Sequence, residues 1–373
     1  MIYLDNAATT KPCKEAVEAM CTAAEAFGNP SSLHGLGLEA EKLIAGSRNT
    51  IAQMLGVDSK TLFFTSGGTE ANNTAIFGTA YDRAKLGKHL ITTKIEHPSV
   101  LEAFRKLEKE GFEVTYLSPD KDGRISLEEL DSSLRSDTIL VSVMHVNNET
   151  GVIQPISEIK NIMKKSPKAL LHCDCVQSFG KINVKPKKWG IDMISISAHK
   201  IHGFKGTGAL YLANQKIKPL LYGGEQQNEI RPGTENIGGI LAFGAAAQKC
   251  ITDSGHMTEL RKAFIERLNS VPDIKINGSS ENNSGSVLNI SFVGIKAEIL
   301  LHALEAHKIY VSTGSACSSH KPQPSHVLTA MGLSKKEIEG AVRISFDESN
   351  RMEEITEAAQ IIEKEVSNIR RYM

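Results

Sequence analysis

The chain has 373 residues, in which 43 lysines and arginines balance 43 aspartates and glutamates, so its formal net charge is zero at pH 7. This balance leaves no overall field that would favour nucleic acid or an anionic membrane surface. The length exceeds what one hydrophobic core usually supports, so we expect two packed domains. The six cysteines lie in dissimilar contexts, which argues against a disulfide framework.

The N-terminal segment MIYLDNAATTKPCKEA has none of the features of a targeting signal. No basic stretch precedes an apolar one, and nowhere does the sequence hold the uninterrupted apolar run that a membrane-spanning helix needs. The sequence therefore predicts a soluble cytoplasmic protein that contacts neither membrane nor nucleic acid.

Short β-rich runs alternate with longer amphipathic stretches along most of the chain. The runs cover residues 61–65, 89–93, 112–117, 138–146, 169–173 and 192–197. This alternation is typical of crossover units in a mostly parallel sheet that is flanked by helices. We therefore predict an α/β fold.

After about residue 258 the pattern changes to helix, a turn rich in Gly, Ser and Asn at 277–286, then strand, helix, strand and a closing helix. We predict a large domain over residues 14–258 and a smaller α+β domain over 259–373. Residues 1–13 are expected to pack beside the small domain.

Polar side chains follow five predicted strands at the point where each strand ends. They are Ser66-Gly67-Gly68-Thr69-Glu70, His97, Asn147-Asn148-Glu149, Asp174 with Gln177, and His199-Lys200. Taken singly, each could be a helix cap, a turn former, a buried histidine or a solvated amine. Because ligands of open parallel sheets bind beyond the carboxyl ends of the strands, their joint occurrence indicates one functional site.

The SGGT stretch, residues 66–69, precedes a predicted helix and is suited to a phosphate, because amide hydrogens and the positive end of the helix dipole converge there. It lacks the P-loop lysine and the dinucleotide glycine spacing, which favours a small phosphorylated cofactor over ATP or NAD. Pyridoxal 5'-phosphate requires such a cradle, a carboxylate for its pyridine nitrogen and a lysine for its Schiff base. We predict this cofactor, with Lys200 as the Schiff-base lysine.

Ten motifs, in their order and spacing, resemble the cysteine desulfurases of the NifS/IscS type within the class V aminotransferase superfamily. They are YLDNAATT (3–10), FGNPSSLHGLG (27–37), FTSGGTEANN (64–73), IEHPSV (95–100), VNNETG (146–151), HCDCVQ (172–177), SAHKIHGFKG (197–206), RPGTEN (231–236), SACSS (315–319) and VRIS (342–345). The resemblance implies a fold-type I enzyme and a homodimer with its active sites near the subunit interface.

The resemblance also implies roles for individual residues. On the cofactor, Asp174 resembles the partner of the pyridine nitrogen, Gln177 the donor to the phenolic oxygen and His97 the residue stacked on the ring. The phosphate ligands are expected to be Gly68, Thr69, Ser197 and His199, with Thr234 from the other subunit. Asn148 and Arg343 resemble the groups that orient the substrate, Arg343 by a bidentate grip on its carboxylate.

Cys317 resembles the nucleophile of this branch and lies in a stretch rich in Gly, Ser and Pro, which predicts a mobile exposed loop. The implied reaction converts L-cysteine to L-alanine. Lys200 removes the α-proton, His97 shuttles a proton, and the Cys317 thiolate takes the substrate sulfur as a persulfide. A protein acceptor, such as an iron–sulfur scaffold or a thiolation protein, would then receive the sulfur, although the sequence does not name it.

Some features depart from the family pattern, and other functions stay open. Cys173 and Cys175 flank Asp174, but on a strand they share a face that excludes His172, so we predict packing residues and no metal site. Glu225 and the region of Asp347 also depart from the family pattern. These departures leave open the choice of partner and the shape of the substrate entrance. A selenocysteine lyase, a class V aminotransferase proper and a catalytically idle sulfur-assembly scaffold are the alternatives.

Overall fold

The computed structural model describes residues 1–213, 216–313 and 324–372. Its helices are α1 (Lys14–Glu25), α2 (Gly35–Leu55), α3 (Gly68–Arg83), α4 (Pro98–Lys109), α5 (Leu127–Ser133), α6 (Ile156–Ile162), α7 (Pro186–Trp189), α8 (Ile237–Lys249), α9 (Gly255–Arg267), α10 (Ala297–Ala306), α11 (His326–Ala330), α12 (Lys335–Glu339) and α13 (Met352–Arg371). Its strands are β1 (Ile2–Tyr3), β2 (Leu62–Thr65), β3 (His89–Thr93), β4 (Glu113–Leu117), β5 (Thr138–Ser142), β6 (Leu170–Asp174), β7 (Met193–Ser197), β8 (Gly208–Leu212), β9 (Ile274–Asn277), β10 (Val287–Phe292), β11 (Ile309–Tyr310), β12 (Ser312–Thr313) and β13 (Ala341–Ser345).

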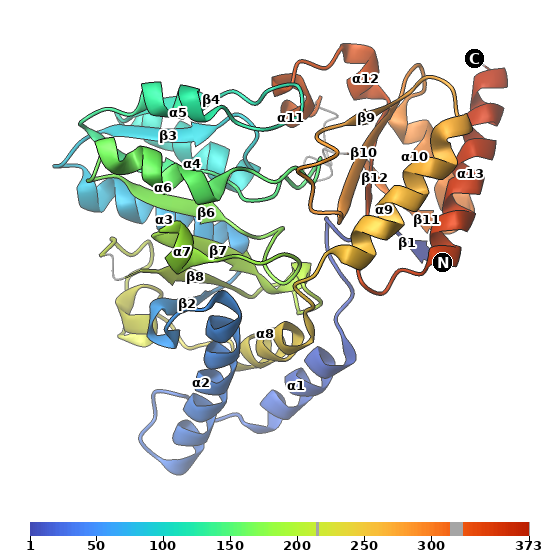
Figure 1. Ribbon diagram of the computed structural model, residues 1–373. Coiled ribbons are helices and arrows are strands. Elements are labelled where there is room, and N and C mark those ends of the chain that lie inside the picture. The colour runs from blue at the N-terminus through green and yellow to red at the C-terminus, as the bar shows by residue number, and fades with distance from the viewer. Residues whose placement is uncertain (214–215, 314–323, 373) are drawn as a thin grey trace.

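The larger sheet has seven strands within the described chain, in the order β2-β8-β7-β6-β5-β3-β4. Strand β8 runs antiparallel to both of its neighbours, while β3 to β7 pair in parallel (Figure 1). The prediction of a mostly parallel sheet flanked by helices is confirmed.

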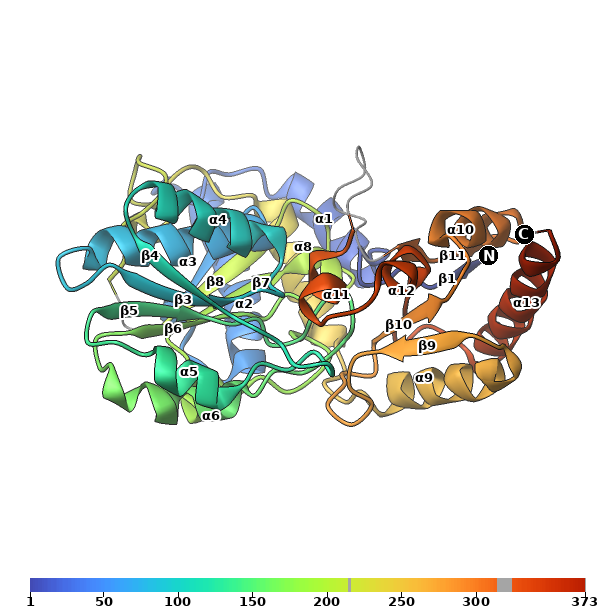
Figure 2. The same cartoon turned by 90° about the horizontal axis from the view of Figure 1, so that it is seen from above.

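Helices cover both faces of this sheet, with α3 and α4 on one side and α5 and α6 on the other (Figure 2). Ile76 and Phe104 pack on the first face, and Leu130 and Ile159 on the second. Every residue of β3, β5, β6 and β7 is buried, as expected for parallel strands that are enclosed on two sides. The carboxyl ends of these strands are therefore the places where polar groups meet solvent.

A second sheet, of order β12-β13-β10-β9, is antiparallel, and β1 pairs in parallel with β11. Helices α9, α10 and α13 pack with these strands around a separate core, where the rings of Phe264 and Phe346 meet edge to face at 5.9 Å. Helix α9 already begins at Gly255. The division into 14–258 and 259–373 stays a prediction.

The N-terminal segment passes from one part of the molecule to the other. Asp5 bridges to Ser345 beside β13, and the Thr10 amide donates to the His199 carbonyl at 2.9 Å. Residues 5–10 thus lie between the two sheets, at the carboxyl end of β7. Within the described residues, no helix combines the length and the apolar character that crossing a membrane requires.

Candidate active site

The N-terminus of α3 forms a compact cradle at the end of β2. Gly67 is the N-cap and offers no side chain, so neither Ser66 nor Thr69 caps this helix. A Cβ on Gly68 would lie 2.7 Å from Cγ2 of Val176 and 3.7 Å from Cβ of Ser197. The first-turn amides of α3 therefore lie close to the ends of β6 and β7, where they can bind an anion.

Asp174 ends β6 with its side chain buried. Its Oδ2 accepts a 2.7 Å hydrogen bond from Nδ2 of Asn72 in α3, and its Oδ1 accepts from the Val176 amide at 2.9 Å. The carboxylate is thus held in one orientation by two donors. The Asn72 amide also donates to Oγ of Ser99, which ties the carboxylate to the start of α4.

Lys200 lies in the short turn after β7 and faces the N-terminal segment. Its Nζ donates to the carbonyls of Ala7 and Ala8, both at 2.7 Å. The Nε2 of Gln177 donates to the same Ala7 carbonyl at 2.9 Å, so the amine and the amide meet at one oxygen. The backbone of residues 7 and 8 therefore positions both groups.

Two histidines border this cluster. Burial lowers the pKa of His97, while Asp174 opposes that shift and Lys200 adds to it, which places His97 within electrostatic reach of both. Burial, with Lys200 and Lys205 nearby, lowers the pKa of His199 to about 4. Nδ1 of His199 lies 3.1 Å from Oγ1 of Thr9. His199 is therefore neutral near pH 7.

Arg343 and Asn148 form a second cluster on the side of the smaller sheet. The buried guanidinium of Arg343 donates from Nη1 to the Asn148 carbonyl at 3.1 Å and from Nη2 to Oδ1 of Asp5 at 2.9 Å. Its Nε is buried and has no hydrogen-bond partner among the described residues. Asp5 also belongs to the N-terminal segment, which thereby joins the two clusters.

Two predicted site residues are not part of these described clusters: Thr234, which lies apart from them, and Cys317, for which the structure gives no position. Thr234 is exposed and lines a cavity of about 210 Å³ together with Ser66 and Arg231. Its predicted contact with a second subunit involves a chain that the structure does not contain. Cys317 lies outside the described residues.

The residues present fit pyridoxal phosphate. The Ser197 hydroxyl is buried beside the α3 cradle and has no hydrogen-bond partner in the described chain, which suits a phosphate ligand. Asp174 offers a fixed carboxylate, and Lys200 an amine, from neighbouring strand ends. An anion cradle, a carboxylate and an amine at one sheet edge are the donor set that this cofactor needs.

Sequence reasoning assigned no role to Asn72, Asp5 or the Ala7 and Ala8 carbonyls. Asn72 follows Thr69 by three positions in the helix, so helical spacing alone would have placed it on the same face. The backbone carbonyls carry no side-chain signal.

Cys173 and Cys175 bring their sulfurs within 3.5 Å in the core. The described residues contain no metal-binding cluster of three or more His, Cys, Asp or Glu side chains.

Comparison with known proteins gives one family. The model of the class-V aminotransferase family matches residues 2–357. The chain is 42% identical to cysteine desulfurase IscS of Dictyoglomus turgidum, with 99% of this chain and 95% of that protein covered. It is 43% identical to cysteine desulfurase IscS of Methanosarcina thermophila, with 99% and 93% covered.

Two solved structures also superpose closely on this chain. A NifS-like protein superposes with a TM-score of 0.92 at 36% identity, over 98% of this chain and 99% of that one. The structure of SspA in complex with cysteine superposes with a TM-score of 0.83 at 36% identity, over 93% and 99%.

Proposed function

This chain belongs to the class-V aminotransferase family, within which it is a pyridoxal phosphate-dependent cysteine desulfurase of the NifS/IscS type, and we propose how its own residues divide the work. The observation that most supports this division is that Lys200, Gln177 and Arg343 all bind one N-terminal segment, while His97 is within electrostatic reach of both Lys200 and Asp174. One segment thus positions the amine of Lys200, the amide of Gln177 and the guanidinium of Arg343.

Residues at several strand ends would hold the cofactor. The first-turn amides of Gly68 and Thr69, with Ser197 and His199, would bind its phosphate, and Asp174 would keep its pyridine nitrogen charged. Gln177 would donate to its phenolic oxygen, and His97 would lie against its ring. When bound, the cofactor supplies an electron sink for a carbanion at the α-carbon of the substrate.

Lys200 and Arg343 act on the substrate. Arg343 binds its carboxylate, and the buried Nε, which has no partner among the described residues, supports that role. Asn148 orients the same end of the molecule. Nζ of Lys200 takes the α-proton of L-cysteine, and the carbonyls of Ala7 and Ala8 hold the resulting ammonium.

Cys317 takes the sulfur. Its thiolate bonds to the sulfur of the substrate as the bond between that sulfur and the β-carbon breaks, and the electron pair of the broken bond stays with the carbon skeleton. Protonation of that skeleton, with His97 as shuttle, gives alanine. Cys317 is left as a persulfide, from which a protein acceptor such as an iron–sulfur scaffold or a thiolation protein takes the terminal sulfur.

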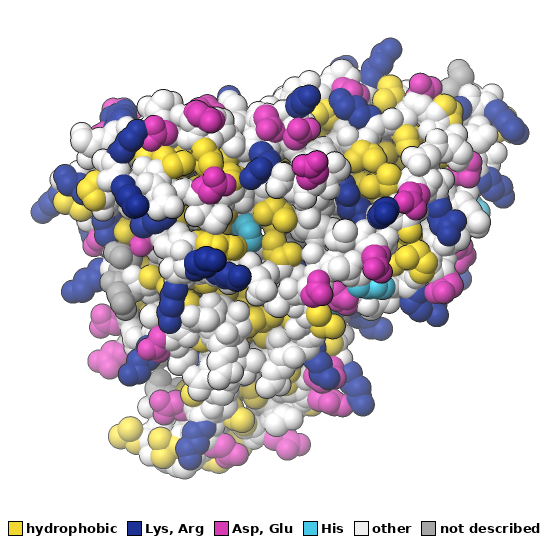
Figure 3. All heavy atoms as spheres, viewed as in Figure 1, with side chains coloured by type: hydrophobic (Ala, Val, Ile, Leu, Met, Phe, Trp, Pro, Cys, Tyr) yellow, Lys and Arg dark blue, Asp and Glu magenta, His cyan; other side chains and the backbone are white. Residues whose placement is uncertain are grey.

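The active unit is a homodimer in which Thr234 of each subunit contacts the cofactor phosphate of the other. Apolar side chains that are largely exposed on the segment before α2 support this, among them Phe27 at 77% and Leu33 at 94% exposure. Figure 3 shows hydrophobic side chains gathered at the lower end of the molecule, where α2 begins. A cytoplasmic location stays a prediction.

The test is to load the protein with pyridoxal phosphate, supply L-cysteine and a reductant, and quantify alanine and sulfide. Equal amounts of both are expected from the wild type, and Lys200→Ala should abolish them. Cys317→Ala should abolish sulfide release with the cofactor still bound, whereas Cys21→Ala, which changes an exposed thiol on α1, should not. Sulfide release retained in Cys317→Ala would refute the nucleophile, and turnover restricted to selenocysteine would favour a selenocysteine lyase.

A further inference from the structure

Lys181 is a buried lysine that the proposed division of labour does not use. It lies in the turn after β6, and only 7% of its surface is exposed. The preceding Gly180 has a φ of +79°, and a Cβ there would meet Cγ2 of Ile201 at 2.6 Å and Sγ of Cys250 at 2.8 Å. The turn therefore requires glycine at position 180.

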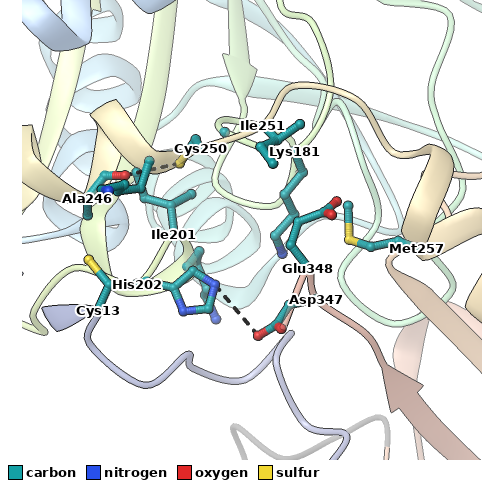
Figure 4. Close-up of a pocket in the computed structure, with 13 residues that line it drawn as sticks. Cys13, Lys181, Ile201, His202, Ala246, Cys250, Ile251, Met257, Asp347 and Glu348 are labelled. Atoms are coloured by element: carbon teal, nitrogen blue, oxygen red, sulfur yellow. Dashed lines mark hydrogen bonds and ion pairs between the residues drawn. The ribbon is translucent and has the colours of Figure 1, made fainter. Parts of the chain in front are cut away.

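The ammonium of Lys181 lies next to the candidate active site, where it contacts Gln177. It lines a cavity of about 90 Å³ together with Lys200, His202 and Asp347. Figure 4 shows Lys181, His202 and Asp347 directed into this hollow, with the imidazole of His202 3.6 Å from the carboxylate of Asp347. The cavity therefore borders Lys200, the proposed Schiff-base lysine.

One side chain of the proposed site touches Lys181 directly. Nζ of Lys181 donates to Oε1 of Gln177 at 3.4 Å, and Nε2 of the same amide donates to the Ala7 carbonyl at 2.9 Å. An amide has a donor end and an acceptor end, whereas an ammonium can only donate and a carbonyl can only accept. Reversing the amide would set its NH₂ against the ammonium and its oxygen against the carbonyl.

We propose that Lys181 is a positioning residue, which holds Oε1 of Gln177 and thereby keeps Nε2 of that amide directed at the cofactor. The inference rests on the proposed role of Gln177 as donor to the phenolic oxygen. One hydrogen of Nε2 binds Ala7, and the other is left for the cofactor. Lys181 contacts neither cofactor nor substrate in this scheme and acts through Gln177.

The charges around Lys181 keep it a cation at neutral pH. Burial lowers its pKa to about 8, and Asp347 opposes that shift. The ionisable groups that line the same cavity or act on Lys181 through space are Asp347, Glu348, Arg343, Cys250, Cys13, His202, Lys200 and Lys249. Most of the Lys181 population is therefore protonated near pH 7, so Nζ can only donate toward Gln177.

The pH titration of the visible absorption band of the holoenzyme tests the inference. A donor to the phenolic oxygen and a nearby cation both disfavour proton uptake by the cofactor imine. Lys181→Met should therefore raise the titration midpoint by about one pH unit, a tenfold change in proton affinity. Lys181→Arg, which keeps charge and donors, should stay near the wild type. Lys249→Met, which removes a solvent-exposed lysine of the same cavity that pairs with Glu15, should leave the midpoint unchanged.

A double-mutant cycle separates positioning from plain charge. If Lys181 acts through Gln177, Lys181→Met should shift the midpoint far less in a Gln177→Leu background. An equal shift with and without Gln177 would overturn the inference. Should Lys181→Met fail to fold, Lys181→Gln, which loses the charge but keeps a donor, replaces it: a midpoint near the wild type supports positioning, and a shift of the same size with and without Gln177 overturns it.

The same spectra distinguish failure of this inference from failure of the proposed function. A wild-type protein that takes up no cofactor would refute the proposed function itself. An unchanged midpoint in Gln177→Leu would refute the role of Gln177. If the wild type takes up cofactor and Gln177→Leu shifts the midpoint, but Lys181→Met does not, only the role of Lys181 is refuted.

Discussion

Glu96 is a fully buried carboxyl group, one residue before His97. Its Oε1 accepts from Oγ1 of Thr93 at 2.9 Å and from the Met144 amide at 2.8 Å, while Oε2 has no hydrogen-bond partner in the described part of the chain. Burial raises the pKa of Glu96 to about 8, and Asp174 adds to that rise. Glu96 is therefore mostly neutral at pH 7, which spares the site a second negative charge beside Asp174.

Glu96→Gln should reduce the pH dependence of folding. The folded pKa of about 8 exceeds the ordinary value of 4.5, so the folded state binds more protons and loses stability as pH rises between these values. The full difference corresponds to on the order of 5 kcal/mol. Urea unfolding of the cofactor-free proteins should show similar stabilities at pH 5 and a variant more stable by a few kcal/mol at pH 8.5. A variant less stable at both pH values would show that the carboxylate is ionised in the fold.

At the residue scale, the sequence predicted which side chains gather but not what holds them. Asp174, Gln177 and Lys200 stand out because polar groups that end apolar strands are conspicuous in a sequence. The positions of the Ala7 and Ala8 carbonyls and of the Ser197 hydroxyl, which has no hydrogen-bond partner among the described residues, depend on the path of the backbone in space. The sequence carries no signal for that path. The roles of these side chains stay predictions.

At the scale of elements, His172 joins three neighbouring strands. Its Nδ1 lies 2.8 Å from Oγ of Ser142 in β5, and its Nε2 lies 2.9 Å from Oγ of Ser195 in β7. Burial lowers the pKa of His172 to about 3. The ring is thus neutral and acts as a polar bridge across the centre of the sheet, away from Cys173 and Cys175.

His172→Leu should destabilise the fold by about 2–4 kcal/mol, because both serine hydroxyls lose a partner in the core. Adding Ser142→Ala and Ser195→Ala should recover much of that loss, since an apolar set leaves no unpaired group. Urea unfolding at pH 7.5 measures both. Below pH 6.5 the wild type should weaken more steeply than His172→Leu, because only its unfolded state takes up a proton there. Parallel behaviour of the two proteins in acid would contradict a neutral His172.

Strand positions were predicted better than strand ends. The run at 138–146 contains β5, but the strand stops at Ser142, and the backbone continues beside β6 through amides that donate to His172 and Asp174. Strand β8, Gly208–Leu212, was not among the predicted runs. It follows a glycine-rich loop and pairs antiparallel between β2 and β7, an order that local patterns do not encode.

At the scale of the whole molecule, the N-terminal segment connects the two sheets. Ile2 and Tyr3 pair with β11, Asp5 binds Arg343, and Ala7 and Ala8 bind Lys200. Sequence reasoning placed residues 1–13 beside the small domain and had no signal for their contacts with Lys200. Such contacts join residues nearly 200 positions apart, and only the packed fold brings them together.

Several of the large exposed apolar side chains lie around the start of α2. Phe27 and Leu33 stand on the segment between α1 and α2, Leu36 and Leu38 lie in the first turn of α2, and Tyr222 is 83% exposed. A cluster of large exposed apolar side chains marks an interaction surface. The proposed homodimer gives these side chains a partner and brings Thr234 to the other subunit.

Phe27→Asp combined with Leu33→Asp should therefore dissociate the dimer. Each unpaired carboxylate in a closed interface costs several kcal/mol, so the dissociation constant should rise at least roughly a hundredfold. Sedimentation velocity should show a wild-type dimer and a folded variant monomer with weaker cofactor binding, because the variant loses Thr234 of the partner. Ile299→Asp, on the exposed side of α10, is the matched control and should remain dimeric. A monomeric wild type, or a variant that stays dimeric with full cofactor affinity, would place the subunit interface elsewhere or remove it.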